Sequence, residues 1–219
     1  MKLTKFQHAC FVVEEDGAAL IVDLGAYTHD FIAPKHVTAI VVTHEHADHF
    51  DEARILELLK AHPKATVIAH ESISGRFTNY TAIGAKVGEQ YIIGPFSLQF
   101  FGGTHAEISD STPVPPNFGV LINNRLYYPG DSFVAPVDHT VNELALPASA
   151  PWMKLSEAMH FLAAVHPHFT FPTHDAILST EGKELADRML GATASGQNTQ
   201  YKRLDGYSIT LPELTTTDQ

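Results

Sequence analysis

The sequence is poor in cysteine, in basic side chains and in long apolar runs. Its single cysteine, Cys10, excludes an intrachain disulfide and a cysteine-based zinc cluster. Cys10 lies in the apolar run 9–13, which predicts a buried and unreactive thiol. Lysine and arginine number 14 against 25 aspartates and glutamates, a formal net charge of −11. That balance disfavours a nucleic-acid partner, because lysine and arginine hold most of the phosphates in such complexes.

No stretch approaches the roughly 18 apolar residues of a membrane span, and the first eight residues lack the apolar core of a signal peptide. We therefore expect a cytoplasmic protein with no membrane partner. The 219 residues are 44% hydrophobic and 18% charged, which is typical of a globular chain. Because no repeat or linker divides the chain, we expect one domain over residues 1–219.

Histidine, in contrast, is abundant, with 14 residues in the chain. Three of them fall with two carboxylates in the stretch 43–49, Thr-His-Glu-His-Ala-Asp-His, directly after the apolar run 38–42. We call residues 43–49 the heptad loop. Imidazole nitrogen and carboxylate oxygen are ligands for zinc, iron and manganese. A polar loop that is merely rich in histidine is the alternative, but the whole pattern at a strand end favours a metal site. His44 and His46 would share one metal, with Asp48 and His49 near a second.

The rest of the chain reads as strands followed by helices, twice over. Strands are expected at 2–6, 9–14, 18–22, 38–42 and 66–69, then two or three within 83–101, and further strands at 118–123, 125–128, 168–172 and 206–211. Helices are expected at 51–61, 71–79, 153–165 and 180–190, the last with Leu185, Met189 and Leu190 on its apolar side. Residues 133–151 show little periodicity, and an unstructured end follows residue 211. This order predicts an α/β protein with two sheets and outer helices.

Four more polar residues directly follow predicted strands, as the heptad loop does. They are Asp23, His105, Asp131 and His174. Different strand ends can converge on one edge of a sheet sandwich, where loops build a site on a rigid frame. The repetition is stronger evidence than any one of these residues.

The pattern His-x-His-x-Asp-His at 44–49 resembles the metallo-β-lactamase superfamily, and the similarity extends over about residues 22–175. The resemblance implies an αββα four-layer sandwich, two mixed β-sheets with helices on the outer faces, and a dinuclear metal site at one edge. By that resemblance, His44, His46 and His105 hold the first metal and Asp48, His49 and His174 the second. Asp131 bridges the two metals, and Asp23 orients a ligand histidine.

Two divalent ions about 3.5–4 Å apart share a hydroxide and hold the oxygens of a substrate. We therefore expect a metal-dependent hydrolase of a small, anionic ester, lactone or phosphoester, with Asp48, Asp131 and His8 as catalytic residues. Zinc is the first expectation for the metal, with manganese and iron as alternatives. A phosphodiesterase or nuclease is the alternative function, followed by an iron-containing redox protein. A homo-oligomer is compatible with the sequence.

The segment Gln7-His8-Ala9 resembles the Gly-His-Ser/Ala of one branch of the superfamily, with Gln7 in place of glycine. That branch includes the L-ascorbate-6-phosphate lactonase, small metal-dependent hydrolases and the N-acylphosphatidylethanolamine phospholipase D. His8 either contacts the substrate and carries a proton, or is a hydrogen-bonded turn residue. The proline-rich loop 110–117 either covers the site or is a passive crossover. Asp175 either supports the site or caps a helix.

Overall fold

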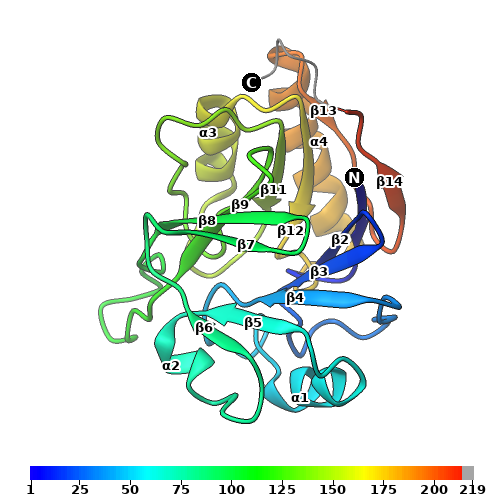
Figure 1. Ribbon diagram of the computed structural model, residues 1–219. Helices are drawn as coiled ribbons and strands as arrows, with labels where there is room; N and C mark the ends of the chain where they lie inside the picture. Colours follow the sequence, from blue (N-terminus) through cyan, green and yellow to red (C-terminus); the bar gives the residue numbers. More distant parts are fainter. Residues whose placement is uncertain (214–219) are drawn as a thin grey trace.

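Four layers make up the protein in the computed structural model, which describes residues 1–213 (Figure 1). The first half contributes β1 (Lys2–Lys5), β2 (Phe11–Glu15), β3 (Ala18–Val22), β4 (Val37–Val41), α1 (Glu52–Ala61), β5 (Thr66–Ala69), α2 (Glu71–Ser74) and β6 (Ala82–Gly84). The second half contributes β7 (Gln90–Ile93), β8 (Phe96–Gly102), β9 (Phe118–Ile122), β10 (Leu126–Tyr128), β11 (Glu143–Pro147), α3 (Leu155–Val165), β12 (Phe169–Thr173), α4 (Thr180–Gly196), β13 (Gln200–Tyr201) and β14 (Ser208–Thr210). Helices α1 and α2 lie outside one sheet and α3 and α4 outside the other.

Both sheets are mixed, as predicted. The first has the strand order β14-β1-β2-β3-β4-β5-β6, and the second has β13-β12-β11-β10-β9-β8-β7. In the first sheet β3 and β4 pair in parallel, so the loops that follow these two strands emerge at the same edge of the sheet. In the second sheet β8, β10 and β12 run in one direction, because β9 is antiparallel to both β8 and β10 and β11 is parallel to both β10 and β12. This topology collects the ends of β8, β10 and β12 at one edge.

Three apolar layers hold the sandwich together. Alternate strand residues of both sheets fill the central layer, including Phe11, Val41, Phe100, Val120 and Phe171. The residues between them on the strands face outwards and pack under the helices. On the first sheet these include Ile21 and Ile40 against Ile55 and Leu59 of α1, and on the second Leu121 and Leu144 against Leu162 and Leu190. Each fully buried aliphatic or aromatic side chain contributes about 1.5–3 kcal/mol.

Two strands were not predicted, the short β13 and the longer β11. β11 lies within residues 133–151, where periodicity predicts no regular element. All five of its residues are buried, because it lies between β10 and β12 and has both faces covered. A strand buried on both sides has no polar alternation to reveal it. Its first residue, Glu143, is buried through a two-pronged ion pair with Arg125, in which Arg125 Nε donates to Oε2 over 2.8 Å.

The predicted apolar face of the last helix is wrong in part. α4 continues to Gly196, and Leu185 and Met189 are 46% and 37% exposed. The buried side consists instead of Ala186, Leu190 and Ala194, spaced four residues apart along one helix face. The other predicted helices are present with shifted ends: α2 stops at Ser74 and α3 begins at Leu155.

None of the helices within residues 1–213 is long and apolar enough to cross a lipid bilayer. Cys10 is buried, and burial raises the pKa of its thiol to about 12, as expected for an unreactive cysteine. The predicted unstructured end includes residues 214–219, which lie outside the described residues.

Candidate metal centre

The structure brings the polar strand ends to one edge of the sandwich. Asp23 follows β3, the heptad loop follows β4, His105 follows β8, Asp131 follows β10 and His174 follows β12. Their ligand atoms form overlapping groups in which all atoms lie within 4.8 Å of one another. The groups are His44 with His46 and His105; His8 with Asp48, His49 and His174; and His44 with His49 and Asp131. The residues predicted as metal ligands therefore occupy one cluster.

The heptad loop is held by the loop after β3. Ala26 N donates to Ala47 O over 2.8 Å and Asp51 N donates to Leu24 O over 3.0 Å. Gly25 lies directly against the backbone of Asp48, and a Cβ on Gly25 would overlap the Asp48 carbonyl oxygen. Glycine is therefore required at this close approach.

Replacing Gly25 with alanine is expected to displace the heptad loop. The added methyl group overlaps backbone that cannot rotate away, so we expect a loss of about 1–3 kcal/mol in the free energy of unfolding together with weaker metal binding. Urea unfolding and a metal titration measure the two effects. The control is Gly196→Ala at the end of α4, where a Cβ would have no atom within 4 Å. Wild-type stability and metal binding in Gly25→Ala would contradict this reading of the loop.

Asp23 orients two of the histidines from behind. Its Oδ2 accepts hydrogen bonds from His49 Nδ1 over 2.7 Å and from Thr43 Oγ1 over 2.6 Å. Because the only hydroxyl proton of Thr43 is donated to Asp23, the hydroxyl oxygen must accept the hydrogen bond from His44 Nδ1, 3.0 Å away. Asp23 thus fixes the tautomer of His49 directly and that of His44 through Thr43.

Backbone carbonyl groups orient two further histidines in the same way. His105 Nδ1 donates to Ala106 O over 2.5 Å, and His174 Nδ1 donates to Ser149 O over 2.6 Å. A carbonyl oxygen only accepts, so each Nδ1 carries a proton, and in the neutral ring each Nε2 presents a lone pair.

The four Nε2 atoms of His44, His49, His105 and His174 are buried and have no hydrogen-bond partner within residues 1–213, and Asp131 Oδ1 is in the same condition. Buried polar atoms are nearly always satisfied, so five unpaired atoms in one cluster require an occupant. Neutral imidazole nitrogens held from behind by Nδ1 hydrogen bonds are the donor set of a divalent metal site. The residues present therefore fit a divalent metal.

Asp131 lies between the histidines. Its Oδ1 is 3.2 Å from His49 Nε2, and its Oδ2 is 3.0 Å from His174 Nε2 and 3.3 Å from His105 Nε2. Asn117 fixes its backbone, because Asp131 N donates to Asn117 Oδ1 over 2.9 Å. A carboxylate with oxygens facing different histidines is suited to contact two ions.

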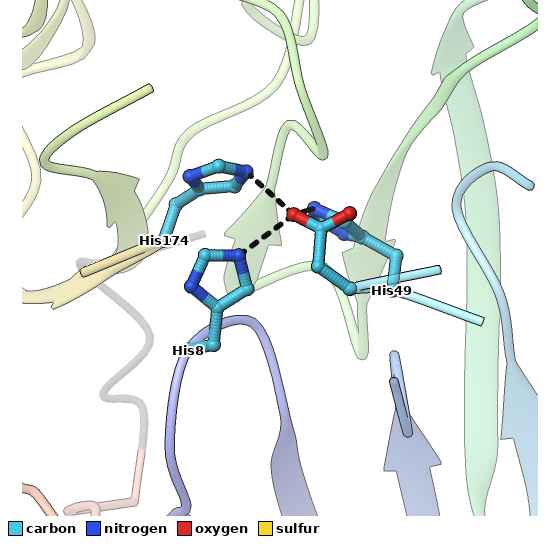
Figure 2. Close-up of side chains that lie close together, drawn as sticks. His8, His49 and His174 are labelled. Carbon is cyan, nitrogen blue, oxygen red and sulfur yellow. Dashed lines mark hydrogen bonds and ion pairs between the residues drawn. The ribbon is translucent and has the colours of Figure 1, made fainter. Parts of the chain in front are cut away.

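His8 is fully buried and contacts Asp48, and Figure 2 shows it beside His49 and His174. Ala176 N donates to His8 Nδ1 over 3.3 Å, so the proton of the neutral ring lies on Nε2, which donates to Asp48 Oδ2 over 2.9 Å. The same Asp48 oxygen is 3.3 Å from His174 Nε2 and 3.6 Å from His49 Nε2. With both ring nitrogens engaged and no exposed surface, His8 is placed to orient Asp48.

Three residues of the cluster have left-handed backbone conformations. His8, Asp23 and His174 have φ angles of 57°, 48° and 56°. Residues other than glycine rarely adopt this region, and such strain concentrates at functional sites. Each of the three turns the chain sharply where it leaves a strand or enters the cluster.

The electrostatics divide the histidines into two kinds. Burial lowers the pKa of His44 and His46, and it lowers that of His8 to about 4, so these rings are neutral. Burial also opposes a charge on His49 and His174, but the Asp131 carboxylate outweighs it and raises the pKa of His174 to about 9. For Asp48 and Asp131, the histidine contacts outweigh burial and hold the pKa below its ordinary value.

Sequence reasoning missed three residues that support the cluster: Thr43, Asn117 and Trp152. Asn117 ends the proline-rich loop 110–117, and Trp152 Nε1 donates to Asp131 Oδ2 over 2.8 Å. Neither residue is close to Asp131 in sequence, and neither follows a recognisable motif. Asp175, which the sequence left open, is buried in an ion pair with Arg203.

Comparison with known proteins gives consistent matches over most of the chain. Residues 2–174 match the family described as Beta-lactamase superfamily domain. Protein Rv0786c of Mycobacterium tuberculosis is 34% identical over 189 residues, which cover 84% of this chain and 88% of that protein. A UPF0173 metal-dependent hydrolase of Hyperthermus butylicus is 29% identical over 196 residues, covering 80% of this chain and 75% of the relative.

Among solved structures, Igni18, a metallo hydrolase of Ignicoccus hospitalis, superposes with a TM-score of 0.74 and 19% identity. The match covers 96% of this chain and 99% of that protein. CmlA, a diiron β-hydroxylase of Streptomyces venezuelae, superposes with a TM-score of 0.73 and 15% identity, covering 96% of this chain and 54% of that protein. At these identities the structural likeness shows a shared fold, and that fold hosts different chemistries.

Proposed function

The chain belongs to the family of beta-lactamase superfamily domains and is a metal-dependent hydrolase, and we propose that it uses two divalent metal ions to cleave a small, anionic ester, lactone or phosphoester. The observation that carries the proposal is the set of buried Nε2 atoms that have no partner within residues 1–213 and that surround Asp131. The wider superfamily match supports hydrolysis. The segment around His8 resembles the lactonase-like branch of the superfamily, so a lactone is one of the proposed substrates.

The groups in the structure support the ligand assignment that the superfamily resemblance implies. His44, His46 and His105 would hold one ion, Asp48, His49 and His174 would hold the other, and Asp131 would contact both. Zinc suits a set of imidazole and carboxylate ligands, and manganese and iron accept the same donors. When bound, such a pair of ions supplies a hydroxide near neutral pH and withdraws charge from substrate oxygens.

The chain's own residues would prepare this chemistry by holding the donors still. Asp23 keeps the Nε2 lone pairs of His49 and His44 directed into the cluster. His8 Nε2 donates a hydrogen bond to Asp48 Oδ2 and so holds that carboxylate towards His49 and His174. Preorganised ligands do not have to be reoriented during the reaction, which lowers its barrier.

The charge balance favours an anionic substrate. The proposed ligands include two carboxylates, Asp48 and Asp131, and otherwise imidazoles that are neutral once a metal binds. Two divalent ions bring four positive charges, so the loaded centre keeps a net positive charge after both carboxylates are counted. A positive centre attracts anions and raises their rate of encounter.

Metal affinity is expected to increase with pH between about 6.5 and 9. In the metal-free protein Asp131 raises the pKa of His174 to about 9, so His174 carries a proton at neutral pH that a metal must displace. Each displaced proton makes the apparent affinity rise by up to about tenfold per pH unit below the pKa of the group that loses it, and the raised pKa of His49 acts in the same direction. Calorimetric titration in buffers of different ionisation enthalpy measures the protons released. Binding without proton release would contradict this result.

The proposed reaction is tested by turnover of a lactone and a phosphodiester, assayed in parallel with protein loaded with zinc or with manganese. His46→Ala is the inactive reference, because it removes one proposed ligand, and His160→Ala on the exposed side of α3 is the matched histidine control. Metal-dependent opening of the lactone supports the lactonase-like branch. Cleavage of the phosphodiester alone supports the alternative phosphodiesterase. Absence of both activities, with two metals bound, would contradict the proposed substrate class.

A further inference from the structure

We propose that Trp152 is the positioning residue that fixes the shared carboxylate Asp131, an inference that rests on the proposed metal set. Trp152 is the only tryptophan in the chain and lies half-buried between β11 and α3. Its Nε1–H donates to Asp131 Oδ2 over 2.8 Å. No motif in the sequence links the two residues, which are 21 positions apart.

The indole differs from the other partners of Asp131 Oδ2. His174 Nε2 and His105 Nε2 lie 3.0 and 3.3 Å from this oxygen, and both nitrogens are proposed metal ligands. When the Nε2 atom of a histidine binds a metal, it carries no proton and therefore cannot donate a hydrogen bond to the carboxylate. An indole N–H is a donor only and has no lone pair for a metal. Of the three side chains within residues 1–213 that contact Oδ2, Trp152 is therefore the one that can still donate a hydrogen bond when the ions are bound.

The indole ring is itself held in place. Phe133 lies against it with ring centroids 5.1 Å apart, and Phe133 in turn contacts Phe161 of α3 at 5.1 Å. The ring centroids of His105 and His174 lie 6.2 and 6.5 Å from that of Trp152, so the indole forms a wall beside the cluster. A hydrogen bond from a rigid aromatic donor to a carboxylate is strong and directional.

The segment that carries Trp152 supports the cluster at two points. Ser149 O accepts a hydrogen bond from His174 Nδ1 over 2.6 Å, and Trp152, three residues later, donates a hydrogen bond to Asp131. Ala148 N is bonded to Thr173 O over 2.9 Å, which ties the start of the segment to the end of β12. The segment 148–152 thus sets the position of a ligand on β12 and of the shared carboxylate after β10.

The first test is metal affinity in Trp152→Phe, which keeps an aromatic ring and removes the N–H. We expect zinc affinity, measured by competition with a chromophoric chelator, to fall by about 10–100-fold, as for other residues that orient metal ligands. The melting temperature of the metal-free protein should change little. Phe133→Leu is the control, because it loosens the packing around the indole but keeps the donor. Wild-type zinc affinity in Trp152→Phe, or an equal loss in both variants, would overturn the inference.

The second test uses the unmodified chain and does not depend on a variant that folds. A single tryptophan gives a single indole N–H resonance in a proton–nitrogen correlation spectrum. We expect this resonance to shift as zinc is added, in proportion to occupancy, and to stay protected from exchange with water at saturation. A resonance that becomes rapidly exchanging on zinc binding would show that the bond to Asp131 breaks, which overturns the inference. Failure of zinc to bind in calorimetry would instead refute the proposed metal centre, and this inference with it.

Discussion

Replacing Asp131 with alanine is expected to remove most of the bound metal and nearly all hydrolysis. Its two oxygens lie 3.0–3.3 Å from the Nε2 atoms of His49, His105 and His174, so the change removes the one proposed ligand that both ions share. Loss of a residue behind a metal ligand already costs 10–100-fold, so we expect kcat/KM to fall by at least about two orders of magnitude. Metal content after dialysis, and turnover of whichever of the lactone and the phosphodiester the wild type cleaves, measure the two effects.

Two variants separate the carboxylate charge from a general loss of structure. Asp131→Asn keeps the size and one oxygen that can accept from Trp152, but it loses the charge that balances two ions. We expect it to keep the fold and to lose metal nearly as Asp131→Ala does. Asp110→Ala removes an exposed carboxylate from the proline-rich loop and should behave as wild type. Full metal content and activity in Asp131→Ala would refute the shared role of Asp131.

The positions of the proposed ligands could be predicted because each lies in a local pattern at a strand end. The heptad loop follows an apolar strand, and single residues such as Asp23, His105 and His174 follow others. The direction of a strand and the topology of the sheet then determine the edge at which its end emerges. Local sequence therefore carries most of the information on which residues meet. The superfamily resemblance indicated which of them would hold the same metal ion.

The residues behind the ligands could not be predicted in the same way. Trp152 and Asn117 act on Asp131 across 21 and 14 positions of sequence, through contacts that only the folded loops create. A threonine after a strand, such as Thr43, is ordinary until its hydroxyl is seen to link Asp23 with His44. The orientation of His8 also depends on an amide from Ala176, which is distant in the chain.

β11 and α4 show the same limit in the scaffold. β11 begins with Glu143 and ends with Pro147, and both residues argue against a buried strand when the sequence is considered alone. Arg125 neutralises the glutamate, and the proline is the last paired residue of the strand, opposite Thr173. On α4, Leu185 and Met189 are more apolar than the alanines that are buried, so hydrophobicity alone selects the wrong face.

Replacing Asp175 with alanine is expected to lower the free energy of unfolding by about 3–5 kcal/mol, the usual cost of leaving a buried charge without its partner. Asp175 is 1% exposed and lies 3.9 Å from Lys5 Nζ, and Lys5 is fully buried at the end of β1. Its other oxygen accepts from Arg203. Asp175 follows His174 directly, so the ion pair also joins β1 of one sheet to the metal-site end of β12 in the other.

The pH dependence of this contribution follows from the same contacts. Burial alone would raise the pKa of the Asp175 carboxyl, but Lys5 and Arg203 outweigh it and hold that pKa below its ordinary value of 3.8. A carboxyl with a depressed pKa in the folded state stabilises the protein above its unfolded pKa and loses that contribution as the pH falls. The difference in stability between wild type and Asp175→Ala should therefore be complete at neutral pH and shrink below about pH 4.

Urea unfolding of four proteins at neutral pH distinguishes the buried pair from surface charge. Asp205→Ala is the matched control, because Asp205 also contacts Arg203 but is 39% exposed, and we expect it to cost less than about 1 kcal/mol. The double variant Lys5→Met with Asp175→Ala also removes the positive charge that would otherwise stay buried without a partner. It should recover part of the lost free energy of unfolding, because an apolar side chain of similar length fills the same space. If Asp175→Ala costs no more than Asp205→Ala, the charge on Lys5 is satisfied by other means. The Phe6 carbonyl oxygen, 2.6 Å from Lys5 Nζ, would then be its principal partner.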